Sequence, residues 1–181
     1  MPQNDSTLIY AVAFAGMEPD NSINFDNYLT KVSEETTKQI PFGRVVMQGT
    51  GDQGCKQFTS QTGKPLGIVP YSAVYQVNKE LASIADSDGN IGLIGGTDIA
   101  IKHRGRLWVK IDENVTPTSA VRARTTVVAT FGPGTFRASA SAGVTNDFSK
   151  FCQWCGTYLA ADGFGLLEFD FLAAKALMVA D

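Results

Sequence analysis

Two cysteines spaced by two residues, Cys152 and Cys155, form the pattern in this chain most often associated with redox or metal chemistry. Redox catalysis of the thioredoxin type places the first thiol at the N-terminus of a helix beside a βαβ core, and the flanking sequence predicts no such context. A tetrahedral zinc site would need Cys55 and His103 as further ligands, which would use every cysteine and the only histidine. We therefore expect no cofactor and no metal, and interpret the cysteines as buried thiols or as part of an intersubunit contact.

A glycine-rich motif, Gly49-x-Gly51-x-x-Gly54, follows a predicted strand and has the glycine spacing of the dinucleotide-binding fingerprint. That fingerprint binds a pyrophosphate because a helix begins within it and presents its N-terminal amides to the ligand. Residues 55–63 do not form an amphipathic helical pattern, and no acidic residue follows about twenty positions later. The motif is therefore predicted to be an ordinary glycine-rich loop.

An acidic turn, Asp86-x-Asp88-x-Asn90, begins like a calcium-binding loop but does not continue like one. Ile91 stands at the sixth position, where the sharp turn requires glycine, and Thr97 stands at the twelfth, where a bidentate glutamate belongs. Nucleophilic catalysis also lacks a base, because His103 lies on a predicted strand among cations that oppose its protonation. We expect a solvated turn here, and a protein that is not an enzyme.

These candidate groups lie in a chain whose clearest pattern is the alternation of side chains along residues 98–111. Ile99, Ile101, Leu107, Val109 and Ile111 fall on one face, and Lys102, Arg104, Arg106, Trp108 and Lys110 fall on the other. Gly105 interrupts the apolar face, where we expect a bulge or a bend. The alternation predicts a strand with one core face and one face that displays cations around an indole.

Further strands are predicted at residues 40–47, 66–77, 121–130, 134–142 and 165–171. Helical patterns are limited to the short stretches 78–85 and 171–180. Strands separated by turns favour an all-β fold, an antiparallel jelly-roll-like sandwich or a barrel with an N-terminal arm and little helix. We expect residues 1–181 to form a single β-rich domain, with 1–39 as an arm or edge region and 172–181 as a C-terminal tail.

Composition narrows the classes of function. The 181 residues are 44% hydrophobic and 18% charged with a net charge of −3, which is typical of a globular protein and argues against non-specific nucleic-acid binding. The apolar stretch 7–16 has only ten residues, against the ~20 needed to span a bilayer, and no Lys or Arg precedes it. We expect no membrane partner, and synthesis in a reducing cytoplasm, where the cysteines are thiols.

Four segments in this order resemble the capsid cement, or decoration, proteins of tailed bacteriophages: residues 8–17 (LIYAVAFAGM), 40–51 (IPFGRVVMQGTG), 64–69 (KPLGIV) and the strand at 98–111. The resemblance implies a β-rich structural virion protein that is made in the host cytoplasm. It implies binding to the outside of a shell of HK97-fold major capsid protein, where the protein bridges neighbouring subunits. Under the same resemblance we expect a homo-oligomer, a trimer or alternatively a dimer, and many modest interfaces repeated over the symmetric shell add through multivalency.

Under this interpretation, two groups of residues are candidate partner contacts. Tyr10 and Phe14 would pair with or pack on an adjoining subunit, or else belong to an edge strand of the protein's own core. Arg104, Arg106 and Trp108 are residue types enriched at interface hot spots, and the alternative is that they form a solvated outer face. A phage tail or baseplate β-domain and a carbohydrate-binding β-sandwich are the alternative functions.

Overall fold

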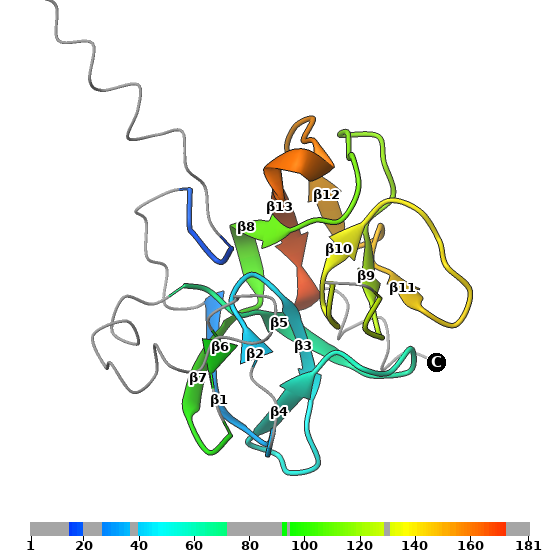
Figure 1. Ribbon diagram of the computed structural model, residues 1–181. Helices are drawn as coiled ribbons and strands as arrows, with labels where there is room; N and C mark the ends of the chain where they lie inside the picture. Colours follow the sequence, from blue (N-terminus) through cyan, green and yellow to red (C-terminus); the bar gives the residue numbers. More distant parts are fainter. Residues whose placement is uncertain are drawn as a thin grey trace, which may run out of the picture.

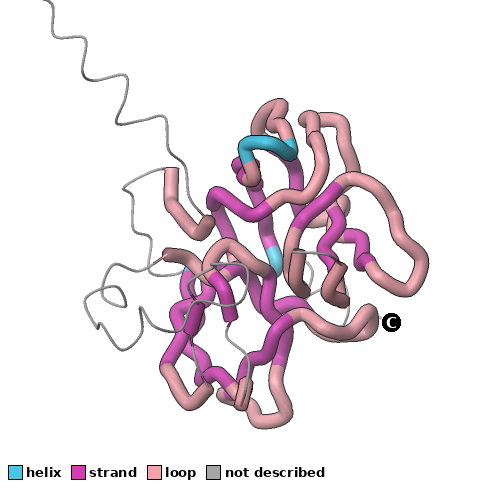
Figure 2. The backbone as a smooth tube through the Cα atoms, in the orientation of Figure 1, coloured by secondary structure: helices cyan, strands magenta, loops and turns pink. Residues whose placement is uncertain are grey.

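The computed structural model describes residues 15–19, 27–36, 40–71, 92–93, 95–128 and 131–172. Strands dominate these residues (Figure 1, Figure 2), and η3 (Ala160–Asp162) is a short 3-10 turn. The prediction of an all-β fold with little helix is confirmed. Tyr10, Phe14, the acidic turn at 86–90 and nearly all of the two predicted helical stretches lie outside the described residues. Within the described part of the chain, no helix has the length and apolarity that crossing a bilayer requires.

Five short strands close into a barrel, which occupies the lower left of Figure 1. In order around the barrel they are β1 (Tyr28–Ser33), β4 (Gly54–Gln57), β3 (Val45–Gln48), β5 (Pro65–Ile68) and β7 (Asp98–Lys102). β1 and β4 run parallel, and the other pairs around the barrel are antiparallel. A separate antiparallel pair is formed by β2 (Ile40–Pro41) and β6 (Gly92–Leu93).

Two three-stranded antiparallel sheets lie to the upper right of the barrel in Figure 1. The first contains, in spatial order, β12 (Cys152–Trp154), β13 (Phe164–Asp170) and β8 (Arg104–Lys110). The second contains β10 (Phe136–Arg137), β9 (Arg122–Arg124) and β11 (Thr145–Asp147). The prediction of a sandwich or a barrel is therefore met by a small barrel with sheets packed beside it.

Period-two alternation sends neighbouring side chains into two hydrophobic clusters. On β3, Val46 packs inside the barrel with Ile99 and Ile101, whereas Val45 packs in the larger cluster between the barrel and the sheets. Both valines are almost fully buried, at 1% and 0% exposure. The first half of β3 therefore buries both of its faces, which explains why two apolar residues, Val45 and Val46, stand side by side rather than alternating with polar ones.

The predicted strand at residues 98–111 is in fact two strands in different sheets. β7 ends at Lys102 in the barrel, and β8 begins at Arg104 in the sheet with β13. Gly105, the second residue of β8, has a φ of +123°, a conformation that residues other than glycine rarely adopt. The interruption therefore falls at His103 rather than at Gly105, where the sequence predicts a bulge or a bend, and the register with β13 continues through Gly105. The apolar residues before and after the interruption line two different cores rather than one face.

Two predicted strands are much shorter than their sequence patterns. Within 134–142 only Phe136–Arg137 forms a strand, and within 121–130 the strand covers Arg122–Arg124. Most other residues of these stretches are Ala, Ser, Thr and Gly, which offer little apolar area to bury on one face. The period-two pattern of such small residues does not create a strand without a hydrophobic face to hold it.

The described N-terminal segment, residues 15–19, is held against the edge of β8. The N–H of Gly16 donates to the carbonyl of Trp108 over 2.7 Å. Glu18 forms an ion pair of 3.0 Å with Lys102, whose side chain is 9% exposed. This segment and β1 both come from the region that sequence analysis treats as an arm or an edge, and both contact the rest of the fold.

Candidate interaction surface

The structure separates the cysteines that the sequence places together. The side chain of Cys152 lies in the core on β12, whereas Cys155 follows the strand and is exposed. Burial raises the pKa of the Cys152 thiol, and burial is also the main reason that the pKa of Cys55 rises to about 11. Such thiols are protonated and unreactive at neutral pH. The interpretation as buried thiols is confirmed for Cys55 and Cys152, and the described residues contain no metal-binding cluster of His, Cys, Asp and Glu.

The glycine-rich loop binds a carboxylate of its own chain. Glu34, which follows β1, accepts hydrogen bonds from the N–H groups of Thr50 and Gly51, each 2.8 Å long, and pairs with Lys56 at 3.1 Å. A Cβ at Gly54 would lie 1.6 Å from a carboxylate oxygen of Glu34, so a larger residue there would displace the Glu34 side chain from the loop. The backbone hydrogen bonds lower the pKa of Glu34 to about 2. The motif is thus a structural loop that ties the β3–β4 hairpin to β1.

Two arginines and two carboxylates form what we call the charge ladder on the outer face of β8 and β13. The antiparallel register places Asp170 opposite Arg104 and Glu168 opposite Arg106. The Arg104 Nε to Asp170 Oδ2 distance is 3.4 Å, and Nε and Nη2 of Arg106 each donate to Glu168 Oε2 over 3.1 Å. All four side chains are 36–61% exposed. Exposed pairs of this kind contribute only about 0–1 kcal/mol each.

Apolar rows continue the same face beyond the charge ladder. Leu166 lies opposite Trp108, and the ring of Tyr158 meets the indole edge-on with the ring centroids 5.5 Å apart. Lys110 lies over the ring of Phe164, with its Nζ 5.0 Å from the ring centroid. The face therefore combines aromatic and aliphatic side chains at one end with paired charges at the other. Interfaces that recognise another protein likewise contain both apolar and polar side chains.

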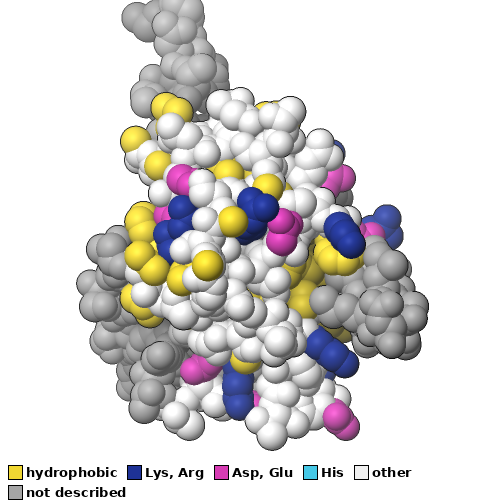
Figure 3. Space-filling model, turned by 90° about the vertical axis from the view of Figure 1, so that its right-hand side faces the viewer, with side chains coloured by type: hydrophobic (Ala, Val, Ile, Leu, Met, Phe, Trp, Pro, Cys, Tyr) yellow, Lys and Arg dark blue, Asp and Glu magenta, His cyan; other side chains and the backbone are white. Residues whose placement is uncertain are grey.

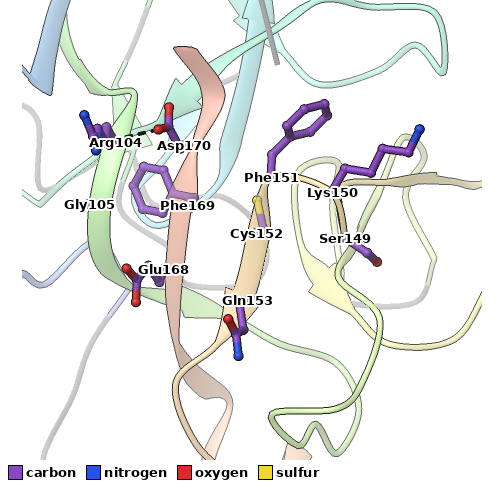
Figure 4. A pocket seen from close by; sticks show the side chains of 10 residues that line it. All are labelled: Arg104, Gly105, Ser149, Lys150, Phe151, Cys152, Gln153, Glu168, Phe169 and Asp170. Atoms are coloured by element: carbon purple, nitrogen blue, oxygen red, sulfur yellow. Dashed lines mark ion pairs between the residues drawn. The ribbon is translucent and has the colours of Figure 1, made fainter. Parts of the chain in front are cut away.

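A surface hollow adjoins the charge ladder at the end of the sheet. It has a volume of about 370 Å³ and is lined by Arg104, Gly105, Glu168, Phe169, Asp170 and residues 149–153. Figure 4 shows Arg104 facing Asp170 across β8 and β13, with the side chain of Gln153 on the neighbouring strand β12. The polar groups at the rim suit contact with a polar surface, and no imidazole lies among the lining residues.

The structure brings together three of the five residues that the sequence nominated. Arg104, Arg106 and Trp108 share the outer face of β8, as the alternation predicts. Sequence reasoning missed Glu168 and Asp170, which already pair with the two arginines. The available signal was the matching spacing of two arginines and two acids, each pair separated by one residue on a predicted strand.

Comparisons with known proteins agree with this architecture. A family model described as "Structural cement protein (E217 gp24/Pam3 gp6)" matches residues 2–168. A solved structure titled "The capsid of Myoviridae Phage XM1" contains a chain of similar fold, with a TM-score of 0.55 and 15% identity over 94% of this chain and 98% of that one. No curated protein matches this sequence. Because the family match spans most of its length, the chain belongs to the phage structural cement protein family and is a structural protein of the capsid and virion.

Proposed function

We propose that this protein binds the outer surface of a phage capsid and cements neighbouring subunits of an HK97-fold major capsid protein. It does so as a trimer or a dimer that is synthesised in the host cytoplasm. The observation that carries this proposal is the outer face of β8 and β13, where the charge ladder adjoins the apolar rows. Tyr10 and Phe14, outside the described residues, are proposed to add an N-terminal contact.

The charge ladder suits binding to a protein that carries its own surface charges. Its exposed ion pairs are weak, so they re-pair with partner groups at little cost. The guanidinium groups of Arg104 and Arg106 match the geometry of partner carboxylates, while Glu168 and Asp170 accept from partner cations. The apolar rows around Trp108 supply the area whose burial stabilises the contact. Repetition over a symmetric shell multiplies such modest contacts.

The direct experiment uses expanded capsids that lack this protein. Purified protein is added, the amount bound is measured by cosedimentation, and the resistance of the shell to heat is measured by scanning calorimetry. We expect saturable binding and a higher transition temperature for the decorated shell. No binding together with an unchanged transition temperature would refute the proposal, and density on the tail in a virion reconstruction would favour the tail alternative.

A charge swap tests the role of the ladder without breaking it. The double variant Arg106→Glu with Glu168→Arg keeps an ion pair on the face but reverses its direction, so we expect unchanged thermal stability. Capsid affinity should fall by about tenfold or more, because like charges then meet across the contact. Asp52→Lys, which reverses an exposed charge in the β3–β4 loop of the barrel, is the matched control and should bind like wild type. Wild-type affinity of the swap variant would mean that this face is only solvated surface.

A further inference from the structure

Three neighbouring segments form a surface without charged side chains, which we call the uncharged face. They are residues 57–63, 125–128 and 138–146, and none of them contains Asp, Glu, Lys, Arg or His. The N–H of Thr125 donates to the carbonyl of Val144 over 2.7 Å, which joins the second segment to the third. Gln61 Nε2 donates to the carbonyl of Thr145 over 3.1 Å, which joins the first segment to the third.

Exposed valines stand at the tip of the second segment. Val127 is 61% exposed and Val128 is 41% exposed. The backbone of Val128 is held against that of Phe131 by two hydrogen bonds of 2.9 and 3.0 Å. Exposed aliphatic side chains beside small Ala, Ser and Gly residues allow close approach of another surface. Their burial by a partner would remove apolar area from water.

Two arginines that flank this face, Arg124 and Arg137, are paired inside the protein, whereas exposed charges, Lys64 and Asp147, stand only at its border. The side chain of Arg124 is 8% exposed and pairs with Asp112, while Nη2 of Arg137 lies 3.1 Å from Glu113 Oε2. Figure 3 views the molecule from the right-hand side of Figure 1, where the β9–β10–β11 sheet lies, and a broad white area without acidic or basic side chains separates scattered charged groups. The three segments themselves therefore contribute uncharged side chains to the surface, with charged residues only at their ends.

The absence of charge favours a second copy of the same chain as the partner of this face, because of the symmetry of such a contact. Around a two-fold or three-fold axis, each residue near the axis meets the same residue of another copy, so a charged side chain there would face its own like charge. Contact with a different protein carries no such restriction, because unlike charges can be matched. We propose that the uncharged face meets the same face of a second copy of this chain, around the symmetry axis of the oligomer. The proposal rests on the homo-oligomer included in the proposed function, and names the surface that forms it.

The test introduces a like charge at the proposed axis. Val127→Asp is expected to weaken self-association by at least about tenfold, measured as native mass over a concentration series by light scattering and native mass spectrometry. The fold should persist, because Val127 is mostly exposed, and the thermal transition of the dissociated variant checks this. Leu159→Asp places the same charge at a residue that is 52% exposed and outside the face, so its mass should equal that of wild type.

Mixing supplies the second arm of the test. Val127→Asp and Val127→Lys proteins should each be dissociated alone and should associate when combined, because the opposite charges then meet across the axis. An unchanged mass of Val127→Asp, or a monomeric wild-type protein at all concentrations, would overturn this inference. Binding of the wild-type protein to capsids tests the cementing function in a separate experiment. A protein that binds capsids but does not self-associate through this face would therefore refute only the present inference.

Discussion

The outer face of β8 and β13 carries exposed charged side chains, whereas the segments of the uncharged face carry none. The first displays Arg104, Arg106, Glu168 and Asp170 as exposed, weak pairs. The second exposes Val127 and Val128, while nearby arginines are paired inside the protein. A surface with exchangeable ion pairs suits an unlike partner, and a surface without charge suits a copy of itself. The two surfaces therefore differ in the charge that they display, which is the difference that the two proposed contacts require.

Removing the buried carboxylate of Asp112 should have the largest effect. Asp112→Ala leaves Arg124 and Arg137, whose side chains are 8% and 16% exposed, without their shared partner. Because an uncompensated buried charge remains, the free energy of unfolding in urea should fall by about 3–5 kcal/mol. Asp170→Ala on the charge ladder is the control, with an expected loss of about 0–1 kcal/mol. Equal losses in the two variants would contradict the distinction between buried and exposed charge.

Salt should separate the two binding activities. Raising ionic strength from about 50 to about 500 mM screens exposed charges, so capsid attachment through the charge ladder should weaken by about tenfold. Self-association through the uncharged face involves no ion pair and should change by less than about twofold. Cosedimentation and light scattering across one salt series measure both quantities. Parallel salt dependence of the two would argue that they use the same surface.

Lowering the pH should weaken the hydrogen bonds that Glu113 makes beside the uncharged face. Glu113 accepts hydrogen bonds from Arg137 and from the backbone of Ser139, where the loop 138–144 begins. Burial raises the pKa of Glu113, but the hydrogen bonds together lower it by more than burial raises it. The pKa of Glu113 in the folded protein is therefore below its ordinary value of 4.5. A lowered folded pKa means that the ionised carboxylate stabilises the fold above about pH 4.5 and loses this effect as the pH falls further.

Glu113→Gln measures that contribution. At neutral pH the variant should unfold with a free energy about 1 kcal/mol lower than wild type, because a charge-assisted hydrogen bond is lost. At about pH 3 the difference should shrink, since the wild-type carboxylate is then increasingly protonated. Urea denaturation at both pH values provides the measurement. A difference that does not depend on pH would show that the charge of Glu113 is not the cause.

The smallest effect is expected for truncation on the charge ladder itself. Arg106→Ala removes a side chain that is 51% exposed and bonded to one carboxylate oxygen of Glu168. The thermal stability of the isolated protein should change by no more than about 1 kcal/mol. The free energy of capsid binding should fall by more than the free energy of unfolding. That result would identify Arg106 as a contact residue rather than a structural one. A large loss of stability with normal attachment would reverse that assignment.

Strand faces were predictable where apolar residues alternate over several positions. The alternation at 165–171 correctly placed Leu167, Phe169 and Phe171 together in the core, and the one near Arg104 and Arg106 correctly placed both on one face. Prediction failed at 134–142, where the alternating residues are too small to hold a strand. It also treated residues 98–111 as one strand, because periodicity does not report that the chain leaves one sheet and enters another.

The sequence by itself determined the all-β class, the faces of the long strands and the resemblance to phage cement proteins, because these depend on local periodicity and on the order of segments along the chain. Tertiary structure alone decided which charges are paired. Arg106 meets Glu168 across 62 positions in the chain, and Glu34 fills a glycine-rich loop 16 or 17 positions away. Such partners are set by strand register and by folding of distant segments, which local residue patterns do not encode.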